Sequence, residues 1–305
     1  MAFTAKDVQA LREMTGVGMM DCKKALTASD GDMDKAVEFL REKGLAASQK
    51  KAGRIAAEGM AYAAVIDGVG VVVEVNAETD FVAKNEKFVN FVKGVAATVA
   101  ANKPADLDAL MACKFEGTEM TVTEQQQEMV LVIGENIKVR RFHFYTEGIS
   151  VPYIHAGGKI GVLVNLETNL TAEQVETTGK DVAMQIAALN PRFWDKSQVD
   201  QATLDEEKKI MMVQMANDPK MANKPEQVRE KIVMGKMNKF YAENCLLQQE
   251  FVKDNSMTVE KYIASAAKAL GGTVTFKNAV RFEKGEGIEK KQENFADEIA
   301  KMVKG

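Results

Sequence analysis

The chain has 305 residues, the length of about two ordinary domains, and carries 40 Lys and Arg against 44 Asp and Glu. This formal net charge of -4 lacks the basic surplus that phosphate contacts need, so we do not expect a direct nucleic acid ligand. Two His and three Cys are too scattered for a zinc site or a disulfide framework, so no metal or cofactor is expected. Without a signal-peptide pattern or a run of roughly 18 apolar residues, the protein is expected to be cytoplasmic, with no membrane anchor.

The N-terminal residues predict a compact module of three short helices. Thr4, followed three residues later by an acid, is a capping-box-like start for the first helix. The second is expected from Met19 to Ala28, and the third is expected to end near Gly44. Residues 45–55 are polar and basic and predict a linker. We therefore assign residues 1–55 to an N-terminal helical module with its linker.

From Met60 the period changes from helical to extended. Two β-branched runs flank Asp67-Gly68, which predicts a β-hairpin. A helix follows, because five apolar residues recur on one helical face: Phe88, Phe91, Val92, Val95 and Val99. Residues 104–128 are irregular and polar with some helical character, and they lead to an alternating segment, residues 134–145, which predicts a strand. We assign residues 56–147 to a first core subdomain.

The second half of the chain repeats this unit. Residues 151–167 have the same hairpin texture, Lys93–Pro104 aligns with Lys180–Pro191, and Asn136–Phe142 resembles residues 277–282. Two copies of a hairpin, helix and strand predict a duplicated α+β core of antiparallel strands and helices. We assign the second core subdomain to residues 148–194 and 244–285.

Residues 195–243 interrupt the second copy with a purely helical pattern. They carry two apolar stripes, Leu204, Met211 and Met215, and Val228, Ile232 and Met237. The Pro-containing segment between the stripes predicts a reversal, and so an inserted antiparallel helical hairpin with a face to bury. Residues 286–305 end in a predicted amphipathic helix with Phe295, Ile299 and Met302 on one side.

Catalytic machinery is nearly absent from the sequence. There is no phosphate-binding loop, nucleophile elbow or zinc-protease helix, so the chain is not expected to bind a nucleotide by itself or to be an enzyme. Cys22, beside two lysines, could be an activated thiol, but we favour inert packing in a small helical module. His155 could act as a base, but without an obvious orienting acid we favour a turn or surface contact.

The segment from Ala77 to Asn85 is more informative. It places a carboxylate, Asp80, beside a large aromatic side chain, Phe81, where an apolar strand meets an amphipathic helix and side chains can project. The alternative is that Thr79 or Asp80 caps the helix and Phe81 continues the core stripe. Composition favours this alternative without deciding between the two.

Five motifs in order along the whole chain resemble the bacterial elongation factor Ts family. They are Met14–Leu26, Thr79–Lys84, Ile133–Ile137, His155–Val162 and Arg281–Glu289. The resemblance implies an N-terminal three-helix module similar to ubiquitin-associated (UBA-like) domains and a two-subdomain core. It also implies an inserted helical dimerisation domain, and hence a homodimer, and a C-terminal helical module.

The function that this resemblance implies is guanine nucleotide exchange on elongation factor Tu during translation elongation. A member of the family binds the GDP complex of that GTPase and disturbs its Mg²⁺ and phosphate site, so that GDP leaves and GTP can bind. Thr79, Asp80, Phe81 and Val82 correspond to the element that intrudes near the magnesium ion, with Phe81 as the wedge.

Further partner contacts carry over by position. Met19, Met20 and Lys23, together with Ile133 and Gly134, correspond to residues facing the partner's nucleotide domain, and His155 to a residue contacting the partner's third domain. Two other classes stay open beside this one. They are a small-molecule enzyme using Cys22 or His155, and an adaptor that binds proteins through the UBA-like module.

Overall fold

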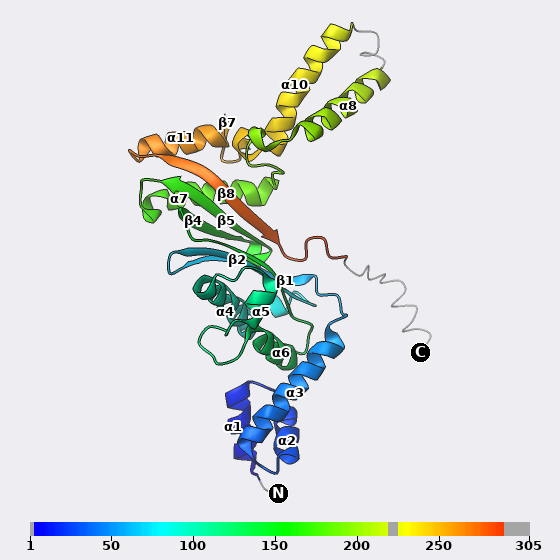
Figure 1. The fold of residues 1–305 in the computed structure, drawn as a ribbon, viewed down its shortest axis with the longest axis vertical. Helices are drawn as coiled ribbons and strands as arrows, with labels where there is room; N and C mark the ends of the chain where they lie inside the picture. The colour runs from blue at the N-terminus through cyan, green and yellow to red at the C-terminus, as the bar shows by residue number, and fades with distance from the viewer. Residues whose placement is uncertain (1–2, 219–224, 290–305) are drawn as a thin grey trace. The chain divides into compact units, whose positions relative to one another are not determined.

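The computed structural model describes residues 3–218 and 225–289 (Figure 1). The chain forms two compact units. The first comprises Met1–Phe144, Ile154–Gly161 and Phe282–Gly305, and the second Tyr145–Tyr153 and Val162–Arg281. Both contain helices and strands, which confirms the α+β class. No helix in the described part of the chain is long and apolar enough to cross a membrane, and the predicted tail helix lies outside the described residues.

Three helices begin the first unit: α1 (Ala5–Thr15), α2 (Met19–Ala28) and α3 (Met33–Lys51). The capping box at Thr4 is confirmed, because the Asp7 carboxylate accepts bonds from the Thr4 backbone N–H at 2.6 Å and from its Oγ1 at 2.8 Å. The helices close over a small core of buried side chains: Val8, Leu11, Val17, Cys22, Ala25, Leu26, Ala36 and Leu40.

Helix α3 is longer than the sequence predicts, because it passes through Gly44 and continues to Lys51. Gly44 is buried against α6 (Val122–Ile133), and a Cβ atom there would lie 3.3 Å from the carbonyl oxygen of Gln127. The missing side chain therefore serves a close helix contact, although glycine lowers helix propensity by about 1 kcal/mol. The prediction that the helix ends near Gly44 is wrong.

The first unit holds a three-stranded sheet in the order β1-β2-β3, with β1 (Glu58–Ile66), β2 (Val69–Ala77) and β3 (Lys138–Tyr145). β1 and β2 form the predicted antiparallel hairpin, with Ile66 opposite Val69. Its turn residues Asp67 and Gly68 have φ values of 49° and 80°, the left-handed pair that a tight two-residue hairpin requires.

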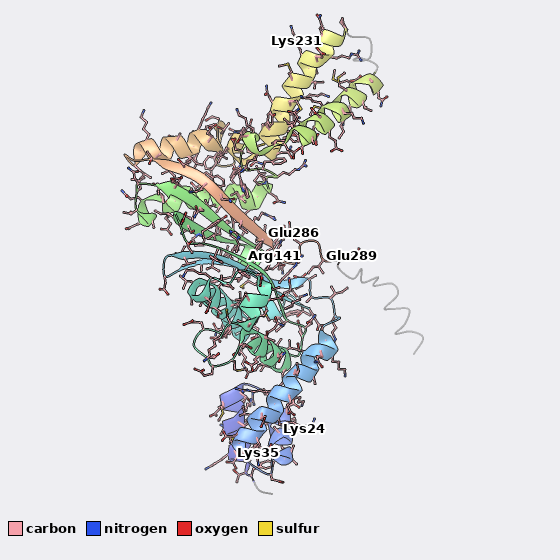
Figure 2. All side chains as sticks on the ribbon, in the orientation of Figure 1. Lys24, Lys35, Arg141, Lys231, Glu286 and Glu289 are labelled. Carbon is pink, nitrogen blue, oxygen red and sulfur yellow. The ribbon has the colours of Figure 1, made fainter. Side chains whose placement is uncertain are left out.

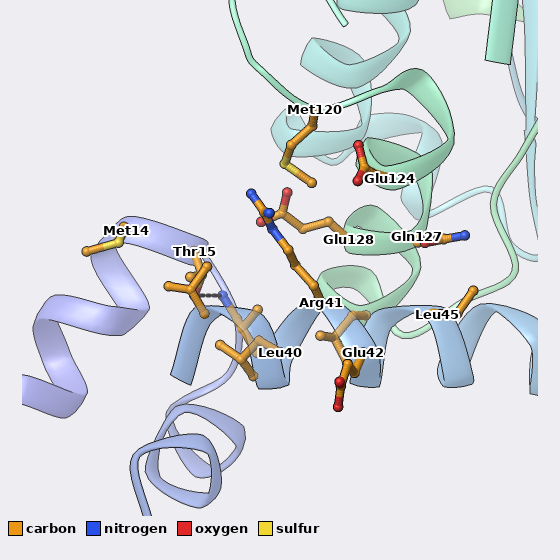
Figure 3. Close-up of a pocket in the computed structure, with 13 residues that line it drawn as sticks. Met14, Thr15, Leu40, Arg41, Glu42, Leu45, Met120, Glu124, Gln127 and Glu128 are labelled. Carbon is orange, nitrogen blue, oxygen red and sulfur yellow. Dashed lines mark hydrogen bonds between the residues drawn. The ribbon is translucent and has the colours of Figure 1, made fainter. Parts of the chain in front are cut away.

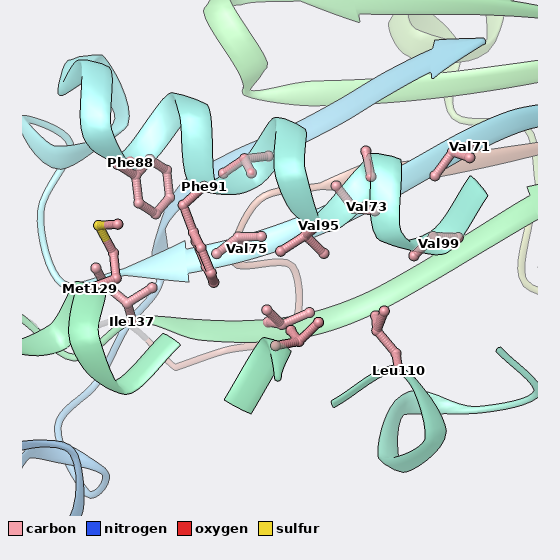
Figure 4. Packing of buried hydrophobic residues seen from close by; sticks show 14 of the residues in the cluster. Val71, Val73, Val75, Phe88, Phe91, Val95, Val99, Leu110, Met129 and Ile137 are labelled. Atoms are coloured by element: carbon pink, nitrogen blue, oxygen red, sulfur yellow. The ribbon is translucent and has the colours of Figure 1, made fainter. Parts of the chain in front are cut away.

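Helices α4 (Glu86–Asn102), α5 (Leu107–Ala112) and α6 pack with this sheet. Figure 4 shows the apolar face of α4 meeting the side chains of β2 in the core. The five residues of the predicted helical stripe are all buried, which confirms that interpretation: Phe88, Phe91, Val92, Val95 and Val99.

Two helical glycines should respond oppositely to alanine. A Cβ atom on Gly94 would lie 2.0 Å from the Phe115 ring, which stacks on Phe91 at a centroid distance of 5.7 Å. We expect Gly94→Ala to destabilise the protein by about 1–3 kcal/mol through overpacking. Gly235, in α10 (Glu226–Asn244), has no atom within 4 Å of such a Cβ, so Gly235→Ala should stabilise by about 0.5–1 kcal/mol. Urea unfolding measures both, and a shift of the same sign would contradict the packing argument.

A carboxylate is buried on the central strand of this sheet. Glu74 accepts hydrogen bonds from Arg140 Nη1 at 2.9 Å, from Arg141 Nε at 2.5 Å and from the Gly285 backbone N–H at 2.8 Å. Arg141 also reaches the Glu286 carboxylate at 3.0 Å, and Figure 2 shows these two residues together. The segment that follows β8 (Val274–Glu283) is thereby attached to the first sheet.

The second unit repeats the first arrangement. Its sheet has the order β4-β5-β8, with β4 (Ile149–His155) and β5 (Ile160–Thr168), and α7 (Ala172–Leu189) follows β5 as α4 follows β2. In each sheet the last strand pairs with the second strand of the hairpin. The predicted duplication is therefore confirmed. The hairpin β6 (Glu250–Phe251) and β7 (Asp254–Thr258) and helix α11 (Val259–Ala269) precede β8.

The inserted segment contains α8 (Gln201–Asn217) and α10. The chain before α8 and the chain at the end of α10 are joined by backbone hydrogen bonds, from Phe193 N to Asn244 O at 3.1 Å and from Leu246 N to Phe193 O at 2.9 Å. Met215 and Met237 are buried between the helices, as the stripes predict. Val228 is 40% exposed, contrary to its predicted stripe, because it lies in the first turn of α10 and a two-helix hairpin covers only one face.

Candidate protein-binding site

The residues between β2 and α4 present an aromatic side chain to solvent. Phe81 is 80% exposed, whereas the next residue, Val82, is buried at the start of the short 3-10 helix η1 (Val82–Lys84). The N-cap of α4 is Asn85, whose Oδ1 accepts the Lys87 N–H at 2.9 Å. Thr79 and Asp80 therefore do not cap the helix, and Phe81 does not continue the core stripe. The alternative interpretation of this segment is wrong.

A carboxylate from a distant part of the chain holds the start of this segment. Glu135 Oε2 accepts the backbone N–H groups of Glu78 at 3.1 Å and Thr79 at 3.0 Å, and Glu135 Oε1 accepts the Thr79 hydroxyl at 2.6 Å. Charge-assisted bonds of this kind are stronger than neutral ones. The loop before Phe81 is thus fixed to the turn that follows α6.

The segment after β2 also binds the residues that follow α6, so the two segments hold each other. Glu78 Oε1 accepts the backbone N–H of Asn136 at 2.6 Å and lies 3.5 Å from Arg54 Nη1. The buried Asn136 side chain in turn donates to the Arg54 carbonyl at 2.8 Å. Three chain segments meet here: the residues after α3, those after β2 and those after α6.

The structure also brings Ile133 beside Phe81. Both line a shallow hollow of about 310 Å³, together with Val82, Asn85, Lys87 and Val132. Gly134 ends α6 in the left-handed conformation, with φ 87°, directly before the bracing Glu135. Two segments predicted separately from sequence are therefore neighbours in space.

Lys87 connects this hollow with the N-terminal helices. Its ammonium donates to the Gly16 carbonyl at 2.9 Å, in the loop just before α2. On α2, Met19 and Met20 are 42% and 66% exposed, and Lys23 is exposed as well. Exposed methionine side chains are flexible and apolar, so they can adapt to the surface of another protein.

Cys22 lies on the opposite, buried face of α2. Its thiol has no exposed surface, and burial raises its pKa, so the thiolate needed for nucleophilic chemistry is disfavoured. The packing interpretation of Cys22 is confirmed. An enzyme mechanism that starts from this thiol is thereby disfavoured.

His155 is not among the residues that line the Phe81 hollow. It is exposed at the end of β4, just before the 3-10 helix η2 (Ala156–Gly158), which packs against β1 at Met60. Among residues 3–218 and 225–289, no group of three His, Cys, Asp or Glu is placed to hold a metal ion.

A second, larger hollow lies between the N-terminal helices and α6. It encloses about 460 Å³ and has apolar walls that include Leu40 and Leu45 (Figure 3). Figure 3 shows Arg41 extending toward Glu128, whose pKa is raised by burial. This hollow and the one at Phe81 share no lining residue.

Comparison with known proteins relates the chain to one protein family. The family model described as Elongation factor TS matches residues 78–286. The chain belongs to the elongation factor Ts family. It is 48% identical to elongation factor Ts of Clostridium kluyveri over 99% of both chains. It is 47% identical to that of Syntrophotalea carbinolica over 100% of both chains, and 49% identical to that of Clostridium perfringens over 98% of both chains.

Membership of the elongation factor Ts family supports a role in translation elongation. The matched region begins at Glu78 and includes the exposed Phe81 and its brace at Glu135. Sequence reasoning missed that brace, although Glu135 stands inside one of the family-like motifs. The available signal was an acidic residue directly after a helix-ending glycine, which does not by itself reveal a partner 56 residues away.

Proposed function

We propose that the protein is a guanine nucleotide exchange factor for elongation factor Tu. The observation that carries the proposal is Phe81, a large apolar side chain that is 80% exposed on a segment braced by charged hydrogen bonds. A fixed, exposed aromatic residue is suited to entering a pocket of another protein. Membership of the elongation factor Ts family favours elongation factor Tu as that protein.

In this mechanism Thr79, Asp80 and Phe81 enter the GTPase near its magnesium site, while Val82, the fourth residue of the predicted element, is buried and anchors the segment from inside the core. Mg²⁺ bridges nucleotide phosphates and is often the largest local charge in such a site. A small displacement of the groups around the ion therefore weakens GDP binding strongly. The chain makes and breaks no covalent bond, and it needs no nucleotide or cofactor of its own.

The remaining contacts extend the same surface. Met19, Met20 and Lys23 of α2, with Ile133 and Gly134 at the end of α6, would face the nucleotide domain of elongation factor Tu. His155 would contact its third domain. The activity would take place in the cytoplasm, where translation elongation occurs.

Thermodynamic linkage limits what such a factor can do. If it weakens GDP binding by a given factor, GDP weakens binding of the exchange factor equally. Exchange is accelerated in both directions, so net GTP loading depends on nucleotide concentrations and on capture of the GTP form by aminoacyl-tRNA.

Release of labelled GDP from the cognate elongation factor Tu tests the proposal. We expect faster release with the protein present, tight binding to nucleotide-free elongation factor Tu, and no nucleotide binding by the protein alone. An unchanged release rate would show that the proposed function is wrong.

We also propose that two copies associate through α8 and α10. Ile210, Val213 and Met234 are apolar and 44%, 54% and 70% exposed on these helices, so each leaves area to bury. Light scattering should give twice the mass of the single chain. Val213→Glu should then yield a monomer, whereas Val252→Glu, at a valine that is 46% exposed between β6 and β7, should leave the dimer intact. A monomeric unmodified protein would contradict this prediction.

A further inference from the structure

We propose that Glu135 is a positioning residue for nucleotide exchange, because it holds the Thr79–Phe81 segment in the orientation that presents Phe81. The inference rests on the proposed function and extends it to a residue whose carboxylate is directed at this chain's own backbone. Both carboxylate oxygens are engaged, Oε2 by the N–H groups of Glu78 and Thr79 and Oε1 by the Thr79 hydroxyl.

The need for such a brace follows from the exposure of Phe81. A side chain that is 80% exposed has little packing of its own to fix its direction. Its position must come from the backbone on each side. On the C-terminal side, Val82 is buried, the Lys84 N–H bonds to the Phe81 carbonyl at 3.2 Å, and Asn85 caps α4.

On the N-terminal side, Glu135 supplies the corresponding restraint. Glu78 and Thr79 follow the last residue of β2, so their N–H groups no longer belong to the β1–β2 ladder. An N–H donor that leaves a sheet needs a new acceptor, and the ionised carboxylate provides one for both. The Thr79–Phe81 segment and the turn that carries Glu135 are then held together, because Glu78 Oε1 also accepts the Asn136 N–H at 2.6 Å.

This geometry predicts which chemical property of Glu135 matters. Glutamine has nearly the same shape, but its amide NH₂ group cannot accept a hydrogen bond. Glu135→Gln therefore removes one acceptor oxygen and the negative charge while keeping the volume. Restraint on the segment should loosen while the packed cores of the unit stay intact.

The test compares Glu135→Gln with Glu124→Gln in the labelled GDP assay at saturating exchange factor. Glu124 is a matched control, since its carboxylate also accepts a threonine N–H and hydroxyl, from Thr121 at 2.7 and 3.0 Å, but at the opposite end of α6. Glu135→Gln should lower the maximal GDP release rate by about tenfold. Phe81 is still present in this variant, but it is less well positioned, and misplacing such a group by a small distance lowers the rate. Glu124→Gln should not change that rate.

A double mutant separates positioning from a merely structural role. If Glu135 acts through the wedge, adding Glu135→Gln to Phe81→Ala should lower the rate no further. If the double mutant instead loses rate by the product of the two single losses, the inference is overturned. It is also overturned if Glu135→Gln releases GDP at the rate of the unmodified protein. Thr79→Val, which removes only the hydroxyl donor, should give a smaller loss than Glu135→Gln.

Hydrogen–deuterium exchange gives a readout that needs no partner. In Glu135→Ala, which removes both acceptor oxygens, the amides of Glu78 and Thr79 should exchange faster, while amides of α4 and β2 keep their protection. Unchanged protection at Glu78 and Thr79 would overturn the brace itself. If instead the unmodified protein fails to accelerate GDP release, the proposed function is wrong and the role of Glu135 in exchange is lost with it, whatever the amides show.

Discussion

Phe81→Ala is expected to lower the maximal rate of GDP release from elongation factor Tu by roughly tenfold to 100-fold. Fully burying a phenylalanine side chain is worth about 1.5–3 kcal/mol, and each tenfold corresponds to about 1.4 kcal/mol. Because Phe81 is 80% exposed in the free protein, that contribution is available only in the complex. The thermal unfolding midpoint should therefore stay unchanged, and both quantities are measured on the same preparation.

Phe88→Ala is the matched control for this prediction. Phe88 lies seven residues further along the chain, in the first turn of α4, and its side chain is fully buried in the core, so the same substitution creates a cavity. We expect it to cost about 3–5 kcal/mol of unfolding free energy. If Phe81→Ala instead lowers stability and leaves exchange intact, Phe81 is a core residue and the wedge mechanism is wrong.

Glu74→Ala is expected to lower the unfolding free energy by about 3 kcal/mol, the range seen when one partner of a buried ion pair is removed. The substitution would leave Arg140 and Arg141 facing a buried cavity and the Gly285 N–H without its acceptor. Urea unfolding measures the change. Glu119→Ala removes a carboxylate that pairs with Lys114 at the surface and should have no measurable effect. Equal stability of the two variants would contradict a structural role for Glu74.

The same carboxylate predicts a pH dependence. Burial by itself raises the pKa of Glu74, but hydrogen bonds from Asn76, Gly285, Arg140 and Arg141 outweigh it and lower the pKa below its ordinary value. An acid with a lowered folded-state pKa stabilises the fold above its unfolded pKa of about 4.3. That stabilisation is lost as the pH falls toward the folded-state pKa. Unfolding at pH 7 and pH 4 should show a smaller acid-induced loss for Glu74→Gln than for the unmodified protein.

Much of the local structure follows from sequence patterns. The β1–β2 turn could be predicted because Asp67 and Gly68 tolerate the left-handed conformation, and the core face of α4 because its apolar residues recur with the helical period. The internal repeat predicted two units with the same succession of hairpin, helix and strand, whereas the strand order within each sheet came from the structure. The turn and the helix face depend on residues that are close in the chain. The duplication follows from the sequence similarity between the two halves of the chain.

Other features depend on which segments meet. Gly44 resembles a helix end in sequence, yet it lies inside α3 because α6 packs closely against it. For Phe81, sequence alone left a core residue and a surface wedge both open. Tertiary structure decided between them, because it placed Val82 in the core and left Phe81 outside.

The sequence by itself determined α1, α2 and α4, the two core hairpins and the duplicated order of elements, because backbone propensity and apolar periodicity act over a few residues. It did not define α5 and α6, which fall largely in the stretch predicted to be irregular. It also identified Thr79–Val82 as a candidate element through its resemblance to elongation factor Ts. Only the tertiary structure showed that Glu135, 56 residues from Thr79, holds that element in place. Hydrogen bonds between distant residues leave no periodic pattern in the chain, since they depend on how separate segments pack together.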